Sequence, residues 1–150
     1  MSNKGSILVV DDSPDGREML AEYLAFRGFH VTTAANGEEA IDIARRVHPD
    51  VTLMDLSLPG IDGWEATRRL KADPLTKHTI VVAVSGHAFS PERMLARDAG
   101  CDGFIVKPYD IAVLGDALER VMAKGVAALD AAAIGFTPAP KRRPLKRQEK

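Results

Sequence analysis

Strand-like and helix-like patterns alternate five times along the first 124 residues of this chain. A short apolar run that suits a strand covered on both faces occupies positions 7–10, and further strand-like segments occupy positions 29–34, 51–54, 80–84 and 103–106. Segments with apolar residues at helical spacing follow them and begin near positions 14, 37, 62, 91 and 111. This alternation predicts an α/β domain with a five-stranded parallel sheet, right-handed crossovers and helices on both faces.

Polar and charged residues follow four of the five predicted strands. Asp11 and Asp12 come directly after the first strand, Asp55 after the third, Ser85 after the fourth and Lys107 after the fifth. The carboxyl ends of parallel strands lie along one edge of a sheet, where α/β folds bind their ligands. We therefore expect three carboxylates, a hydroxyl and an amine to gather at this edge.

This set of side chains suits phosphoryl transfer. Three neighbouring carboxylates repel one another unless a cation neutralises them, and Mg²⁺, a hard ion with oxygen ligands, does so. The Asp55 carboxylate can then act as a nucleophile toward phosphorus and form an aspartyl phosphate. Lys107 supplies a positive charge for Asp55 and for the incoming phosphoryl oxygens, and Ser85 can donate a hydrogen bond to one of them. Positioning and charge neutralisation are most of what this reaction needs.

Four stretches of the sequence carry a resemblance to a known family. They are Ile7–Asp12, Met54–Gly63, Val84–Gly86 and Phe104–Pro108, in that order and at the ends of predicted strands. Over about residues 5–124, the chain resembles a stand-alone, CheY-like receiver domain of the two-component response regulators. The resemblance implies a flavodoxin-like (βα)5 fold with strand order 2-1-3-4-5.

The resemblance also implies the chemistry of the acidic site. Asp55 would be the phosphoacceptor. Asp11, Asp12 and Asp55 would hold Mg²⁺, Asp12 more directly than Asp11, with the backbone carbonyl of Ser57 as a further ligand.

Three more positions take roles from the family. Ser85 would be the hydroxyl that moves toward the phosphoryl group, and Phe104 would be the aromatic residue that follows it when the domain switches. Lys107 would bridge to the phosphate, and its bond to Pro108 is expected to be cis, a geometry that normally occurs only before proline.

The function implied by the resemblance is that of a signalling switch in a two-component or phosphorelay pathway. A sensor histidine kinase or a histidine phosphotransfer protein would donate the phosphoryl group, and the chain would catalyse only its own phosphorylation and dephosphorylation. We expect a downstream protein target that the sequence does not identify. A homodimer through the fourth helix, fifth strand and fifth helix is left open.

The end of the chain differs in character from the predicted domain. Residues 141–150 hold six lysines and arginines and one glutamate, a charge of +5, so the first 140 residues carry −6 of the total of −1. We expect a receiver domain over 1–124 and a flexible tail over 125–150, Ala-rich at first and then rich in proline and basic residues. The basic residues have no aromatic residues among them, which argues against nucleic acid as a partner. We expect no DNA-binding output domain.

The cysteine content and the length of the apolar runs indicate in which cellular compartment the protein is expected. Cys101 is the only cysteine, which excludes an internal disulfide and a cysteine-based zinc cage. We expect it to be a small buried residue without a redox role. No apolar run approaches the roughly 20 residues of a membrane span, so the sequence predicts a cytoplasmic protein without membrane insertion.

Two other functions fit parts of the pattern. A phosphohydrolase of the haloacid-dehalogenase type also uses an aspartyl nucleophile, but such enzymes usually place a second aspartate two residues later, where this chain has Ser57. The second alternative is an interaction module with a vestigial acidic pocket, in which the basic tail does the binding.

Overall fold

A computed structural model of the protein describes residues 4–56, 58, 60–86, 95, 98–125 and 136–138. The strands among these residues are β1 (Ser6–Val10), β2 (His30–Ala34), β3 (Val51–Asp55), β4 (Ile80–Ser85), β5 (Gly103–Val106) and β6 (Phe136–Pro138). The helices with complete bounds are α1 (Pro14–Phe26), α2 (Gly37–Val47), α3 (Gly63–Ala72) and α5 (Ile111–Lys124). Of the helix expected over 91–100, the described residues Leu95, Asp98 and Ala99 are helical.

The strands form one sheet in the order β2-β1-β3-β4-β5-β6. The first five are parallel, which confirms the predicted order 2-1-3-4-5. Val10 pairs with Met54, Asp55 with Val84, and Ser85 with Val106. This register brings the carboxyl ends of β1, β3, β4 and β5 to the same edge.

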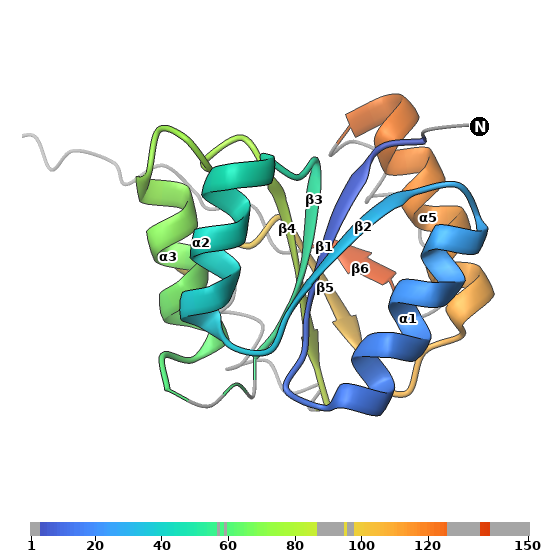
Figure 1. Ribbon diagram of the computed structural model, residues 1–150, viewed down its shortest axis with the longest axis horizontal. Coiled ribbons are helices and arrows are strands. Elements are labelled where there is room, and N and C mark those ends of the chain that lie inside the picture. Colours follow the sequence, from blue (N-terminus) through green and yellow to red (C-terminus); the bar gives the residue numbers. More distant parts are fainter. Residues whose placement is uncertain are drawn as a thin grey trace, which may run out of the picture.

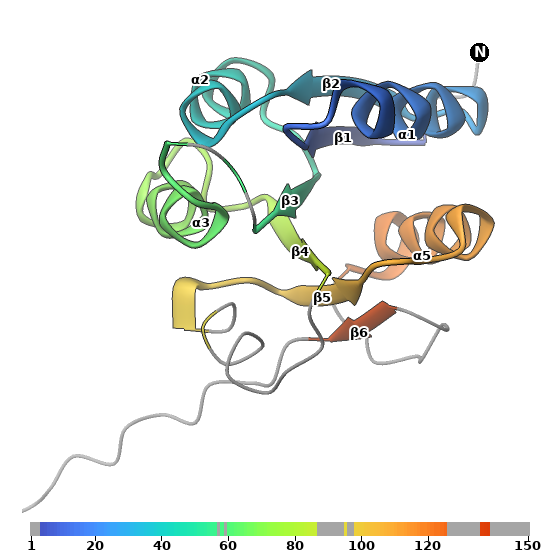
Figure 2. The same ribbon diagram turned by 90° about the horizontal axis from the view of Figure 1, so that it is seen from below.

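Helices cover both faces of the parallel sheet, as predicted. Helices α1 and α5 lie on one face and α2 and α3 on the other (Figures 1 and 2). Successive residues of β1 alternate between the two cores, Ile7 packing with Leu24 and Leu118, and Leu8 with Ala44 and Leu70. Strands β1 and β4, which are buried on both faces, are accordingly almost entirely apolar, whereas the outer strand β2 is more polar and less buried. Each fully buried aliphatic side chain contributes about 1.5–3 kcal/mol to folding.

Each of the four helices begins at a capping residue in the loop that follows a strand. The side chains of Asn36 and Asp62 accept hydrogen bonds from the amides three residues ahead, at 2.9 and 2.8 Å. Ser13 accepts from the Gly16 amide at 3.4 Å, and Asp110 from the Ala112 amide at 2.8 Å. Such caps stabilise a helix end by about 0.5–2 kcal/mol and fix the path of the chain. The loops that carry the predicted site residues are therefore anchored at the start of each helix.

Strand β6 is a departure from the sequence analysis, which placed residues 136–138 in a flexible tail. In the structure these three residues pair antiparallel with β5, with Phe104 opposite Thr137. The rest of the predicted tail after Gly125 lies outside the described residues. Within the described part of the chain, no helix has the length and apolar character to cross a membrane.

Candidate functional site

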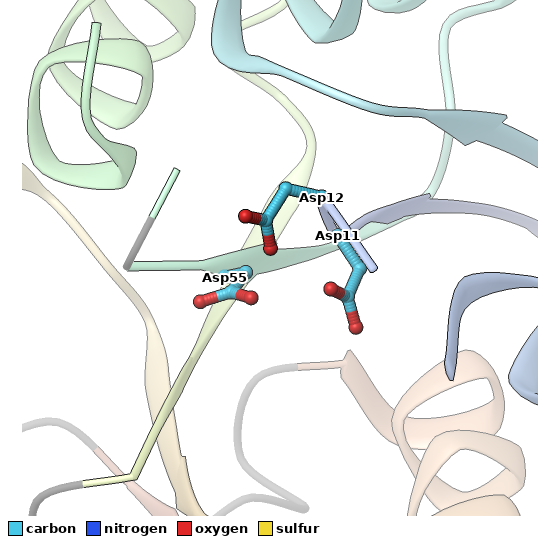
Figure 3. Close-up of side chains that lie close together, drawn as sticks. All are labelled: Asp11, Asp12 and Asp55. Carbon is cyan, nitrogen blue, oxygen red and sulfur yellow. The ribbon is translucent and has the colours of Figure 1, made fainter. Parts of the chain in front are cut away.

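Three aspartates meet at the carboxyl edge of the sheet. Asp11 and Asp12 follow β1 and Asp55 ends β3, and one carboxylate oxygen from each lies within 4.8 Å of the other two. Figure 3 shows the three side chains converging. Asp55 is only 4% exposed, whereas Asp12 is exposed and Asp11 intermediate. This group was predicted from the sequence, and the fold brings all three residues together.

Hydrogen bonds to strand β2, to the next loop residues and to helix α1 hold the loop that carries Asp11. The Asp11 amide donates to the Ala34 carbonyl at 3.1 Å, and the Asp11 carboxylate accepts from the Ser13 amide at 2.9 Å. The Arg17 guanidinium donates to the Asp11 carbonyl at 2.8 Å. Arg17 was not predicted as part of the site, because nothing in its sequence position shows that its side chain turns back from α1.

The site carries an excess of negative charge that suits a cation. Burial raises the pKa of the Asp11 carboxyl, and the charges of Asp55 and Asp12 raise it further, while the Ser13 amide and the Lys107 charge lower it. Three carboxylates this close, one of them nearly buried, offer the oxygen ligands that Mg²⁺ prefers. The residues present therefore fit a magnesium ion.

Lys107 reaches the acidic group from the end of β5. Its Nζ lies 3.4 Å from Asp55 Oδ2, and its amide donates to the Ser85 carbonyl at 2.8 Å. The Lys107 side chain is 40% exposed and that of Asp55 only 6%. The bond between Lys107 and Pro108 is cis, which confirms the prediction.

The two predicted switch residues are both buried. Ser85 ends β4 and is 2% exposed, and Phe104 in β5 is fully buried in the core between the sheet and helices α2 and α3. Their movements on phosphorylation stay a prediction. Ser57, predicted to supply a carbonyl ligand, lies outside the described residues.

Besides Arg17, two more residues of this site were not predicted from the sequence. Gly63 at the start of α3 packs so closely on β3 that an added Cβ would lie 2.4 Å from the Asp55 carbonyl oxygen and 2.9 Å from Leu56 Cα. Tyr109 is half-buried, and its pKa is raised by burial and then by the charges of Asp11 and Asp55. The place of Tyr109 just beyond the carboxyl end of β5 was a usable signal, whereas Gly63 looked like an ordinary residue of a first helical turn.

A doubly wound α/β domain with three carboxylates and a lysine at its carboxyl edge has the fold and the acidic site of a receiver domain. The chain belongs to the response regulator receiver domain family, whose profile matches residues 7–119. It is therefore a receiver domain of the two-component signalling systems, with a flavodoxin-like fold.

The chain is similar to individual response regulators in sequence and in structure. The chain is 33% identical over 106 residues to the polar-differentiation response regulator DivK of Brucella ovis. The aligned segment covers 71% of this chain and 86% of DivK. Chemotaxis response regulator CheY4 of Vibrio cholerae superposes with a TM-score of 0.73 at 29% identity, over 78% of this chain and 98% of that one. A putative response regulator from Chloroflexus aurantiacus gives a TM-score of 0.74 at 30% identity, over 80% and 98% of the two chains.

Proposed function

We propose that this protein is a response regulator that accepts a phosphoryl group on Asp55 from the phosphohistidine of a sensor histidine kinase or a histidine phosphotransfer protein. The observation that carries the proposal is the setting of Asp55. Its nearly buried carboxylate lies within 4.8 Å of two other carboxylates and has the Lys107 ammonium 3.4 Å away. A carboxylate held beside cations in this way is positioned to attack phosphorus, and the cations neutralise the charge of the phosphoryl oxygens, as phosphoryl transfer requires.

The reaction exchanges one bond at phosphorus for another. A carboxylate oxygen of Asp55 attacks the phosphorus atom, the P–O bond forms, and the P–N bond to the donor imidazole breaks. The imidazole leaves with the electron pair and takes up a proton from solvent. Hydrolysis of the acyl phosphate by water returns Asp55 to its carboxylate, so the chain would catalyse only its own phosphorylation and dephosphorylation.

Asp11, Asp12 and Asp55 would hold Mg²⁺, with the Ser57 carbonyl as a further proposed ligand. When bound, Mg²⁺ supplies charge neutralisation for the carboxylates and for the phosphoryl oxygens. Lys107 contributes a second positive charge from the carboxyl end of β5, at the same edge of the sheet. Arg17 holds the Asp11 carbonyl in place and so orients the loop that carries two of the ligands.

Phosphorylation would act on the rest of the domain through Ser85 and Phe104. A phosphoryl group on Asp55 would draw the Ser85 hydroxyl inward, and Phe104 would move into the space that Ser85 leaves. The population shift would alter the surface of the fourth helix, β5 and α5 for a downstream protein, or for a second copy, in the cytoplasm.

Membership of the receiver family argues against the phosphohydrolase alternative. The division into a receiver domain over 1–124 and a tail over 125–150 is retained as part of the proposal. The vestigial interaction module is the outcome to be expected if neither Mg²⁺ nor beryllofluoride binds.

The test is phosphorylation by radiolabelled acetyl phosphate in the presence of Mg²⁺. Asp55→Asn should abolish labelling, because the amide is not a nucleophile. Asp50→Asn is the matched control and should be labelled as the unaltered chain is, because Asp50 precedes β3 at its other end and an asparagine can still accept from the Ser6 amide. Labelling of the Asp55→Asn protein to the unaltered extent would refute the site.

A further inference from the structure

Strand β6 turns β5 from an edge strand into an interior one. β5 pairs with β4 on one side, and residues 136–138 pair with it on the other, Gly103 opposite Pro138 and Ile105 opposite Phe136. Figure 2 shows β6 beside β5, at the end of the sheet away from β2. An uncovered edge presents unpaired N–H and C=O groups that other extended segments can join. This segment therefore occupies the backbone groups that a partner strand would use.

The pairing is short enough to be reversible. β6 has three residues and one of them is Pro138, which has no N–H to donate and is tolerated in edge strands. Few hydrogen bonds form, and the entropy lost by ordering the three residues opposes them. A small change in β5 can therefore shift the balance between paired and released states.

The linker before β6 allows release without disturbing the domain. Ten residues, 126–135, separate the Gly125 cap of α5 from Phe136. Fully extended, ten residues span up to about 33–36 Å, while the 14 residues of α5 span about 21 Å. The segment can therefore leave the β5 edge and return to it while α5 stays packed.

β5 also connects this edge to the acidic site. Phe104, which pairs with Thr137 on one side and Ala83 on the other, is the predicted switch residue. Two residues beyond Ile105, Lys107 contacts Asp55, and its amide is bonded to the Ser85 carbonyl. A change at Asp55 therefore acts on the strand whose backbone holds β6.

We propose that residues 136–138 form a reversible cap on the edge of β5, which is released when Asp55 is phosphorylated. The release step rests on the proposed function. Capping hides the β5 edge in the resting state and release exposes it, so the tail would regulate access to this part of the output surface. Because coupling between sites is reciprocal, a chain that cannot form the cap should bind a phosphoryl analogue more tightly.

The first experiment follows a nitroxide label on Thr137→Cys in the full chain. Cys101 is 6% exposed and burial raises its pKa to about 12, so it should not take up the label, and labelling of the unaltered chain checks this. We expect a slowly moving label at rest and a freely moving one after Mg²⁺ and beryllofluoride are added. A label on Lys124→Cys, at the end of α5, is the control and should not change.

The outcomes separate this inference from the proposed function. Bound beryllofluoride is measured on the same sample by ¹⁹F NMR. If it binds and the Thr137→Cys label is mobile throughout, or immobile throughout, the reversible cap is overturned. If beryllofluoride does not bind, both the proposed function and the release of β6 by phosphorylation are contradicted. An immobile label at position 137 would then still support the pairing of β6 with β5.

A second variant tests the reciprocal effect. The double substitution Phe136→Pro and Thr137→Pro removes every N–H from β6, since Pro138 has none. Its dissociation constant for beryllofluoride should fall about fivefold, the lower range of usual coupling between sites. An unchanged dissociation constant would contradict the coupling between the cap and Asp55.

Discussion

Lys107 Nζ lies 3.4 Å from Asp55 Oδ2, although 52 positions separate the two residues in the chain. Asp55 ends β3 and Lys107 follows β5, and β4 lies between these strands. The contact spans the end of β4, where Ser85 accepts a hydrogen bond from the Lys107 amide. The pair therefore joins three strand ends into one site.

Lys107→Ala should impair phosphorylation far more than folding. The Lys107 side chain is 40% exposed, and ion pairs with an exposed partner contribute only about 0–1 kcal/mol to stability. Loss of the ammonium should slow labelling by acetyl phosphate at least about tenfold, because charge neutralisation is the main contribution to this reaction. Lys124→Ala, in the last turn of α5, is the control for loss of a lysine. Labelling of Lys107→Ala at the unaltered rate would contradict the assigned role.

Asp11→Asn should stabilise the protein when Mg²⁺ is absent. Burial and the charges of Asp55 and Asp12 disfavour the charged form of Asp11, and asparagine can still accept from the Ser13 amide. Since the site is partly open to solvent, we expect a gain of about 1 kcal/mol in the free energy of unfolding. Urea unfolding in EDTA measures it, with Asp42→Asn on exposed α2 surface as the control.

The same variant should change how stability depends on pH and on Mg²⁺. A carboxyl whose pKa is raised in the folded state binds more protons there than in the unfolded chain, so stability falls as pH rises above its ordinary value of 3.8. Asp11→Asn should lack this part of the pH dependence. Mg²⁺ should also raise the free energy of unfolding of Asp11→Asn by less than that of the unaltered chain, because an ion stabilises the folded state only if the folded state binds it. Equal responses of the two proteins to Mg²⁺ would count against Asp11 as a ligand.

Gly63→Ala should destabilise the fold and impair the site together. The added Cβ would lie 2.4 Å from the Asp55 carbonyl oxygen, and the backbone around it cannot yield easily. We expect a loss of about 2 kcal/mol or more, with slower phosphorylation because the Asp55 backbone is displaced. Gly86→Ala is the matched control, since its Cβ would meet nothing within 4 Å. Equal unfolding free energies for the two variants would show that the close approach is not real.

Cys101 should be unreactive while the protein is folded. It is 6% exposed, and burial raises its pKa from 9.0 to about 12. At pH 8 the thiolate fraction is then about 1000-fold lower than for an ordinary thiol. A chromogenic disulfide reagent should modify Cys101 only in denaturant, whereas an added Lys124→Cys should react in the native state. Rapid native modification of the unaltered chain would disprove the buried setting of Cys101.

Much of the fold and of the site could be predicted from the sequence, for a local reason. The spacing of apolar residues within a segment depends on how that segment alone is buried. The strands, the helices and the residues at the strand ends could therefore be identified from the sequence. Asp11, Asp55 and Lys107 were found because parallel strands place their carboxyl ends at one edge.

The tertiary structure decided what depends on packing between distant segments. The approach of Gly63 to Asp55 and the return of Arg17 to the Asp11 carbonyl leave no periodic signal in the chain. The pairing of residues 136–138 with β5 is the clearest case. Three residues ending in Pro138 have no strand pattern of their own, and they form a strand because the fold provides the backbone groups of β5 beside them.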